Sequence, residues 1–293
     1  MSDPGQRPRR SPAVPSPTRE RLIATAVSLL ERDGMTVGLD HLSLEHVIAR
    51  SGVSRASAYR HWPTKQDFLR DVLVTVVRST TLDGESPVEV ADLLGLLEER
   101  RAELGSEQGR RDLVVEALRR STHADLTRLV DSPRWRTYLA LHATCQGLPE
   151  GDLREDVRVT LAASEARFTA QRAGVYARLP TLIGYRLVPP LIAPEGFEVM
   201  AAAAGALMTG LVVRSLTDPG QQDRTMRLAA FGSTREEAWS RPAYQLTALL
   251  FGYLVPDPDV HWDAAQLARS RATLEEIVRE LDPARARATD HPS

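Results

Sequence analysis

The chain has 293 residues, 42% of them hydrophobic, and a net charge of −2, which together exclude a disordered chain and a polycation. The charge is uneven, because residues 1–80 carry 12 basic and 8 acidic side chains, a net of +4, whereas residues 81–293 carry 25 and 31, a net of −6. A basic first part joined to an acidic remainder indicates an anionic partner for the first part alone.

The first predicted segment is a basic arm without regular structure. Residues 1–17 contain five prolines and three arginines, a composition typical of disordered tails. Apolar side chains at spacings of three and four then predict helices, and serine, threonine and glycine at the ends of these patterns predict their caps. The predicted helices of this part are 18–32, 43–50, a short one between 54 and 63, and 65–78.

The second and third of these helices have the layout of a helix-turn-helix, since Ser51 and Gly52 turn the chain between two short helices. The second helix of such a motif enters the major groove of DNA, where its first residues meet base edges. Arginine can pair with the two acceptors of guanine, a serine hydroxyl can face a donor or an acceptor, and alanine lets the backbone approach. The sequence therefore predicts base contacts from Arg55, Ala56 and Ser57, and phosphate contacts from Tyr59, His61 and Lys65.

The stretch LSLEHVIARSGVSRASAYRHWPTKQDFL, residues 42–69, resembles the DNA-binding domain of bacterial transcriptional repressors of the TetR family. The resemblance rests on Val47-Ile48-Ala49, Gly52-Val53-Ser54, Tyr59, His61-Trp62 and Lys65, and it covers about Thr18–Leu73. It implies an all-α fold, with a three-helix helix-turn-helix domain over residues 18–80 and a larger C-terminal helical bundle over residues 81–293 for dimerisation and ligand binding. By resemblance, the base-reading residues are Arg55, Ala56, Ser57 and Arg60, and the phosphate contacts are Thr18, Ser43, Ser54, Tyr59, His61 and Lys65.

Beyond Leu82 the pattern stays helical, and strand signals are weak. Gly205–Pro219 and Ala243–Pro258 resemble the two helices that form the four-helix bundle of a TetR-type homodimer; ordinary core helices of a monomer are the alternative. A dimer places two helix-turn-helix units on a twofold axis, which predicts a palindromic operator in double-stranded DNA. The predicted helices of this part are Val88–Leu104, Arg110–Val130, Trp135–Cys145, Leu153–Leu179, Phe197–Leu216, Arg235–Leu254 and Asp263–Leu281.

Aromatic and methionine side chains of the second part are candidates for the lining of an effector pocket, because such pockets are mostly apolar. The alternative is that most of them are ordinary core residues. His142 and Cys145 stand three apart on one helix face, but two ligands do not make a zinc site, so neither a metal nor a cofactor is expected. The pocket candidates are Trp135, Tyr138, His142, Phe168, Tyr176, Tyr185, Met200 and Met208.

The compartment follows from three further features. The single cysteine, Cys145, allows no internal disulfide and favours a reducing cytoplasm. The N-terminus lacks the apolar core of a signal peptide, and the longest apolar run, Val199–Val213, is shorter than the roughly 20 residues that span a bilayer. The sequence therefore predicts a cytoplasmic protein that does not enter a membrane.

Two classes of function remain in view. The leading prediction is a homodimeric DNA-binding transcription regulator rather than an enzyme, most simply a repressor that a small-molecule effector releases from its operator. The alternative is an all-α enzyme or an interaction protein whose helix-turn-helix is only structural. The chain contains no G-x-S-x-G, H-E-x-x-H, P-loop or dinucleotide-binding motif, which weakens the enzyme alternative without excluding it. The operator, the effector, the regulated genes and the sign of regulation stay open at this point.

Overall fold

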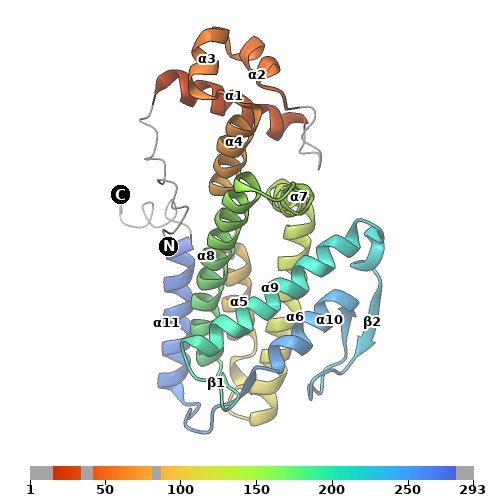
Figure 1. Ribbon diagram of the computed structural model, residues 1–293. Helices are drawn as coiled ribbons and strands as arrows, with labels where there is room; N and C mark the ends of the chain where they lie inside the picture. Colours follow the sequence, from red (N-terminus) through yellow and green to blue (C-terminus); the bar gives the residue numbers. More distant parts are fainter. Residues whose placement is uncertain (1–15, 34–41, 81–86, 282–293) are drawn as a thin grey trace, which may run out of the picture. The chain divides into compact units, whose positions relative to one another are not determined.

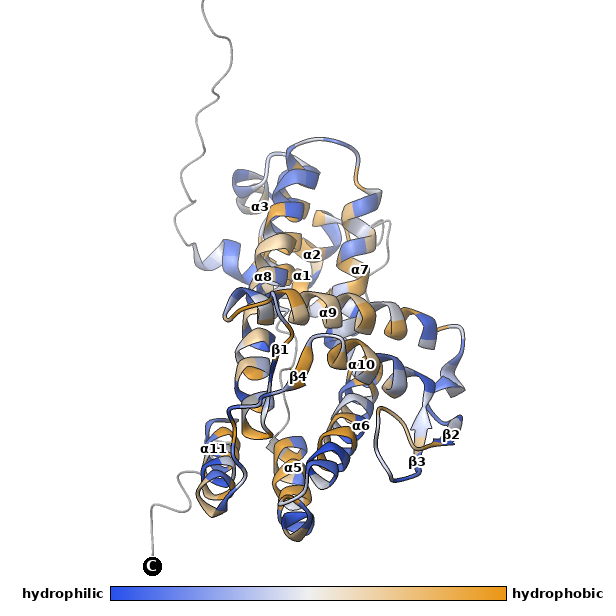
Figure 2. Ribbon diagram, turned by 90° about the horizontal axis from the view of Figure 1, so that it is seen from below, coloured by the Kyte–Doolittle hydropathy of each residue, from blue (hydrophilic) through white to orange (hydrophobic). Residues whose placement is uncertain are grey.

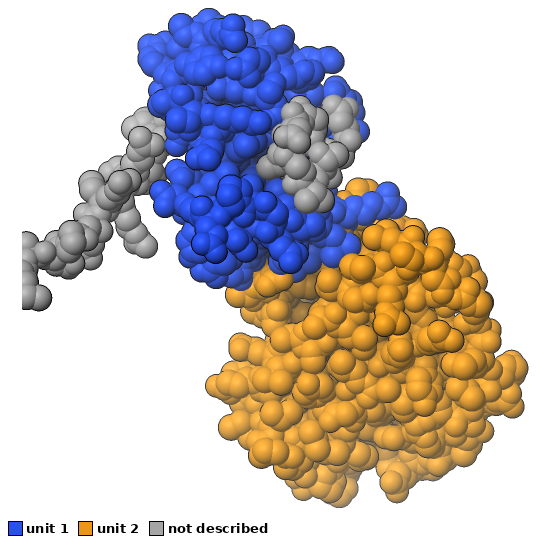
Figure 3. All heavy atoms as spheres, turned by 45° about the vertical axis from the view of Figure 1, so that its right-hand side comes forward, with its two compact units in different colours: residues 1–81, 136–164 blue, residues 82–135, 165–293 orange. Residues whose placement is uncertain are grey.

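The computed structural model of the chain describes residues 16–33, 42–80 and 87–281, so the predicted basic arm lies outside it except for its last two residues. The described residues fold into two compact units (Figure 3). Unit 1 contains the described residues within the ranges 1–81 and 136–164. Unit 2 contains the described residues within the ranges 82–135 and 165–293. Figure 1 labels their helices and strands in chain order.

Unit 1 contains the four helices that the sequence predicts for the first part of the chain. Local caps explain where they begin, because the side-chain oxygens of Ser43, Ser54 and Thr64 each accept a hydrogen bond from the backbone N–H three residues later. Gly52, with a φ of 70°, ends the second helix in the left-handed conformation that glycine tolerates best. The helices are α1 (Pro17–Asp33), α2 (Leu44–Ser51), α3 (Arg55–His61) and α4 (Lys65–Ser79).

Unit 1 also takes in the end of α7 (Pro133–Gly147) and the start of α8 (Asp152–Leu182). Their side chains are buried in the same hydrophobic core as those of α1 to α4, and Arg70 Nε of α4 lies 3.0 Å from Asp156 Oδ2 of α8. Part of the stretch 81–293, which the sequence predicts as one domain, thus contributes to the core of the first compact unit. The residues that do so are Leu141, Cys145, Val157 and Leu161.

Unit 2 is a helical bundle in which α10 packs against α6 and α9, and α11 packs along α5. Its core includes Val114, Phe197, Met200 and Leu250, contributed by α6, α9 and α10. Its helices, besides the remaining parts of α7 and α8, are α5 (Pro87–Glu99), α6 (Glu107–Asp131), α9 (Glu195–Ser215), α10 (Arg241–Phe251) and α11 (Ala264–Leu281), with 3-10 turns at Arg101–Glu103 and Pro219–Gln221.

Two short antiparallel strand pairs interrupt the helices of unit 2. β1 (Tyr185–Leu187) pairs with β4 (Leu254–Pro256), and β2 (Thr225–Leu228) pairs with β3 (Glu237–Ser240). The predicted helix Arg235–Leu254 is therefore wrong over its first six residues and its last three, since α10 covers only Arg241–Phe251. These residues pair with β2 instead, and the Trp239 side chain is completely buried, in a cluster with Val115 and Phe231. The fold class is nevertheless all-α, as predicted.

Candidate nucleic-acid interface and apolar cavity

Helix α3 turns a row of polar and basic side chains to solvent. It begins at Arg55 after the Ser54 cap, and it anchors itself through Ala58, which is fully buried. The neighbouring positions on the other face are therefore open: the Arg55 side chain is 71% exposed, and Ala56 and Arg60 are exposed as well. An exposed helix face of this kind is what contact with base edges in a major groove requires.

Ser57 is less accessible than the other three base-reading candidates, and its hydroxyl has partners within and beside α3. It is half-buried, and its Oγ accepts hydrogen bonds from Ser54 Oγ at 2.9 Å and from Arg60 Nη2 at 3.3 Å. The structure thus links Ser54, Ser57 and Arg60 along one side of α3. Base reading by these residues stays a prediction.

The six predicted phosphate contacts lie on four different helices or their caps. Lys65, at the first turn of α4, and Tyr59, with 39% of its surface accessible, are exposed. His61 is half-buried, with its Nε2 3.4 Å from Ser16 Oγ, and Thr18 on α1 is also half-buried. The remaining two, Ser43 and Ser54, serve as N-caps of α2 and α3.

An acidic residue that the sequence analysis did not single out lies among these groups. The Tyr59 hydroxyl donates a hydrogen bond of 2.5 Å to Glu45 Oε1, and Arg55 Nη2 lies 3.9 Å from the same oxygen. The hydrogen bond from Tyr59 holds the pKa of Glu45 below its usual value, and the same bond raises the pKa of Tyr59. Glu45 is therefore an ionised carboxylate that contacts Tyr59 and Arg55, two residues that are expected to face DNA.

We expect Glu45→Gln to raise the affinity for non-specific DNA by roughly two- to fivefold at 0.1 M salt, because it removes a negative charge from the path of the phosphates and weakens the hydrogen bond that holds Tyr59. Fluorescence anisotropy with scrambled duplexes over a salt series measures this. Glu155→Gln makes the same change of charge at an exposed site on α8 and should have no effect. Weaker operator binding with unchanged non-specific binding would contradict the prediction and assign Glu45 to a cytosine instead.

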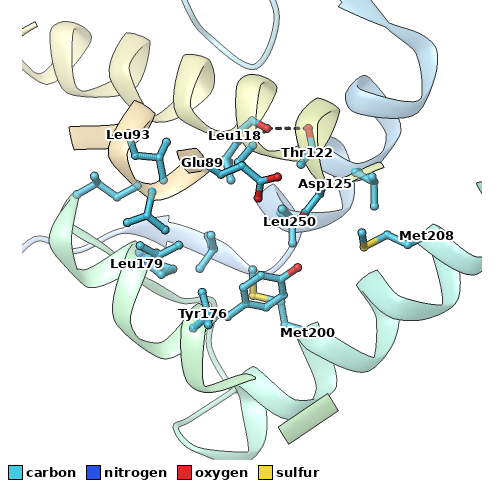
Figure 4. Close-up of a pocket in the computed structure, with 17 residues that line it drawn as sticks. Glu89, Leu93, Leu118, Thr122, Asp125, Tyr176, Leu179, Met200, Met208 and Leu250 are labelled. Carbon is cyan, nitrogen blue, oxygen red and sulfur yellow. Dashed lines mark hydrogen bonds between the residues drawn. The ribbon is translucent and has the colours of Figure 1, made fainter. Parts of the chain in front are cut away.

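Unit 2 contains an apolar cavity of about 90 Å³ between α5, α6, α8, α9 and α10 (Figure 4). Of the eight predicted pocket residues, three line it: Tyr176, Met200 and Met208. Its lining also contains Glu89 of α5 and Asp125 of α6, which the sequence analysis missed because no local pattern shows which acidic side chains face a cavity. Figure 4 shows these carboxylates among leucine, methionine and tyrosine side chains.

The other five predicted pocket residues lie elsewhere. Tyr185 lines an open groove beside the start of α6. Trp135 packs edge-to-face against Phe168, with ring centroids 6.2 Å apart, as core residues do. Tyr138 and His142 belong to unit 1, where their rings form a T-shaped contact at 4.4 Å. The structure therefore does not bring these five into the cavity.

Cys145 is buried in the core of unit 1, and this burial raises the pKa of its thiol, so the thiol is protonated at neutral pH. Within the described residues, no three histidine, cysteine, aspartate or glutamate side chains gather in a group that could hold a metal ion.

Comparison with known proteins matches part of the first unit to one family of proteins. Residues 22–72, from α1 to α4, match the model of a family described as bacterial regulatory proteins, tetR family. The curated proteins contain no match to the chain. Two similar solved structures are the reduced form of NemR from E. coli, 14% identical, and NalD, the secondary repressor of the MexAB-OprM multidrug efflux pump in Pseudomonas aeruginosa, 21% identical.

The two alignments extend well beyond the matched domain. The alignment with NemR covers 82% of this chain and 98% of NemR, with a TM-score of 0.42. The alignment with NalD covers 83% of this chain and 98% of NalD, with a TM-score of 0.36.

Proposed function

We propose that this chain is a homodimeric repressor of transcription that a small molecule releases from its operator, and the match of residues 22–72 to the model of the tetR family of bacterial regulatory proteins supports this proposal. The observation that supports it most is the surface of α3, where exposed Arg55, Ala56 and Arg60 stand opposite the buried anchor Ala58. The site of action is the cytoplasm, where a bacterial chromosome is accessible.

Dimerisation is supported by an uncovered apolar face on α9. This helix has 21 residues and a mean hydropathy of 1.7 in its most apolar stretch, of which only 44% is buried. The whole helix is therefore long enough to span a bilayer, although the apolar run Val199–Val213 within it is not. A partially buried helix in a bundle is, however, weak evidence for a span, and a second copy of the chain is the occupant we propose.

The shape of this face suits a helix–helix contact. Val199 and Val213 are about half exposed, at 48% and 47%, and Leu216 is 68% exposed. Between them the exposed positions carry small residues, which allow two helices to approach closely: Ala202, Ala206 and Gly210. Figure 2 shows α9 beside α10, each with hydrophobic residues along its length, and the two helices are in contact. Two copies of this pair make a four-helix bundle.

Release by an effector is supported by the cavity in unit 2 and by the continuity of α8. One unbroken helix carries Val157 and Leu161 in the core of unit 1, and Tyr176 and Leu179 in the lining of the cavity. A ligand that prefers one arrangement of α8 shifts the equilibrium by the difference between its affinities for the two arrangements, and by no more.

The test of DNA binding separates the two kinds of contact. On an operator selected from random duplexes, Lys65→Ala should weaken specific and non-specific binding by similar factors and reduce the slope of log affinity against log salt by about one. Arg55→Ala should weaken operator binding by roughly 10- to 100-fold and relax the preference at one base pair, because arginine discriminates guanine.

Arg158→Ala is the matched control, since Arg158 is an exposed arginine of unit 1 paired with Glu155 on α8. It should bind both kinds of DNA like the unchanged protein. If Lys65→Ala also keeps the original affinity and salt slope, α3 and α4 do not dock on DNA as we propose.

A further inference from the structure

The cavity in unit 2 has a charged end. Glu89 and Asp125 reach it from two different helices, and their side chains are only 16% and 22% exposed. Of the described residues that line the cavity, none is basic. Arg128, one turn along α6 from Asp125, contacts both carboxylates: its Nε lies 3.2 Å from Glu89 Oε1, and its Nη2 donates a hydrogen bond to Asp125.

The sum of these three charges is negative. The guanidinium of Arg128 pairs with both carboxylates, and the formal charges of Glu89, Asp125 and Arg128 sum to −1 at the edge of an apolar space. A charge placed in such a space is costly unless it is paired and hydrogen-bonded. A cation bound inside the cavity would neutralise this group, whereas an anion would add to its charge.

The rest of the cavity is mostly apolar, and a second apolar space lies beside it. The first is lined by leucine, valine and methionine side chains, with the ring of Tyr176 beside Met200 (Figure 4). The second, of about 70 Å³, shares Leu93, Leu118, Ser121, Leu179 and Ile183 with the first and ends at Leu274 of α11.

The size of these spaces restricts the ligand further. Both are small compared with the roughly 300–1,000 Å³ of pockets that hold drug-sized molecules. They fit a narrow alkyl chain better than a polycyclic compound, and the shared residues place the two spaces next to each other, so that a chain can extend from one into the other.

We propose that this cavity binds a small alkylammonium ion, with the ammonium group between Glu89 and Asp125 and the alkyl chain in the two apolar spaces. This inference rests on the proposed function, since it names the chemical class of the effector. The ammonium group donates hydrogen bonds to the two carboxylates in competition with Arg128, and charge-assisted bonds of this kind are among the stronger ones in proteins.

The test uses three probes of equal length and different charge: n-hexylammonium, hexanol and hexanoate. Isothermal titration calorimetry on the full chain without DNA should show binding of n-hexylammonium, binding of hexanol at least about tenfold weaker, and no binding of hexanoate. Equal binding of hexanol and n-hexylammonium, or preference for hexanoate, would overturn the inference. This series needs no variant, so it stands even where a substitution impairs folding.

Variants then locate the cation. Glu89→Gln and Asp125→Asn should each weaken n-hexylammonium binding by about 10- to 100-fold and leave hexanol binding nearly unchanged. Asp131→Asn, which removes an exposed carboxylate from the end of the same helix, should leave both affinities unchanged. Equal losses for both probes would mean that the substitutions damage the cavity as a whole, which would overturn the assignment of the ammonium site.

DNA release is measured separately, so that the two proposals can fail separately. If n-hexylammonium binds without releasing the operator, the cavity binds alkylammonium ions as we propose, but the proposal that this cavity is the effector site is overturned. Release of the operator by hexanol, with no binding of n-hexylammonium, would retain the effector role and overturn the ligand class.

Discussion

Replacing Ala206 with glutamate should turn the protein into a monomer and lower its affinity for a two-half-site operator by about three orders of magnitude. Ala206 lies in the middle of the exposed apolar face of α9, between Val199 and Val213. In the proposed bundle, two glutamates related by the twofold axis would meet in a contact that has room only for small side chains. A monomer retains one recognition helix and loses the second half-site.

Light scattering after size-exclusion chromatography measures the mass, and gel shifts measure the affinity. The control is Ala272→Glu, which makes the same substitution at an exposed position of α11 and should leave a dimer. An Ala206→Glu protein that remains a dimer would show that α9 does not form the interface, and the four-helix bundle would have to be abandoned.

Replacing Trp62 with alanine should lower the free energy of unfolding of unit 1 by about 3–5 kcal/mol. The indole is 1% exposed and packs edge-on against Phe68, with ring centroids 5.3 Å apart. Its Nε1 donates a 2.7 Å hydrogen bond to Asp71 Oδ2, which also accepts one from Arg19 of α1. The side chain therefore joins the end of α3 to α4 and, through Asp71, to α1, so DNA binding should be lost with it.

Urea titration followed by circular dichroism measures the loss of stability. The comparison variant is Trp62→Phe, which retains a ring against Phe68, loses the hydrogen bond to Asp71, and should cost only about 1 kcal/mol for that bond plus a packing loss smaller than that of alanine. Asp71 retains Arg19 as its partner in both variants. If the alanine variant unfolds at the same urea concentration as the unchanged protein, Trp62 does not anchor α3.

The first four helices could be predicted because their signals are local. Ser43, Ser54 and Thr64 cap helices that begin at the next residue, and Gly52 ends one of them, so each boundary depends on a few neighbouring residues. β3 could not be predicted in the same way. It depends on pairing with β2, from which it is separated by eight residues, and on burial of Trp239 against distant side chains.

The cavity shows a similar limit. Aromatic and methionine residues indicate an apolar interior, but the sequence does not distinguish a side chain that lines a space from one that fills it. Trp135 and Phe168 pack against each other, whereas Tyr176 and Met208 border the cavity. Glu89 and Asp125 were missed because acidic side chains are normally assigned to the surface, and only the three-dimensional position of Arg128 explains their partial burial.

The composition of unit 1 from two separate stretches of the chain has a consequence for how such a protein can evolve. A gene segment that ends at residue 81 encodes the α3 surface that we propose contacts DNA, but not the core residues Leu141, Val157 and Leu161. Recombination that exchanges only this segment between two such proteins would combine helices α1 to α4 from one protein with the α7 and α8 core residues of the other. New DNA specificity in this lineage should therefore arise more readily by point substitution on α3 than by exchange of a whole N-terminal module.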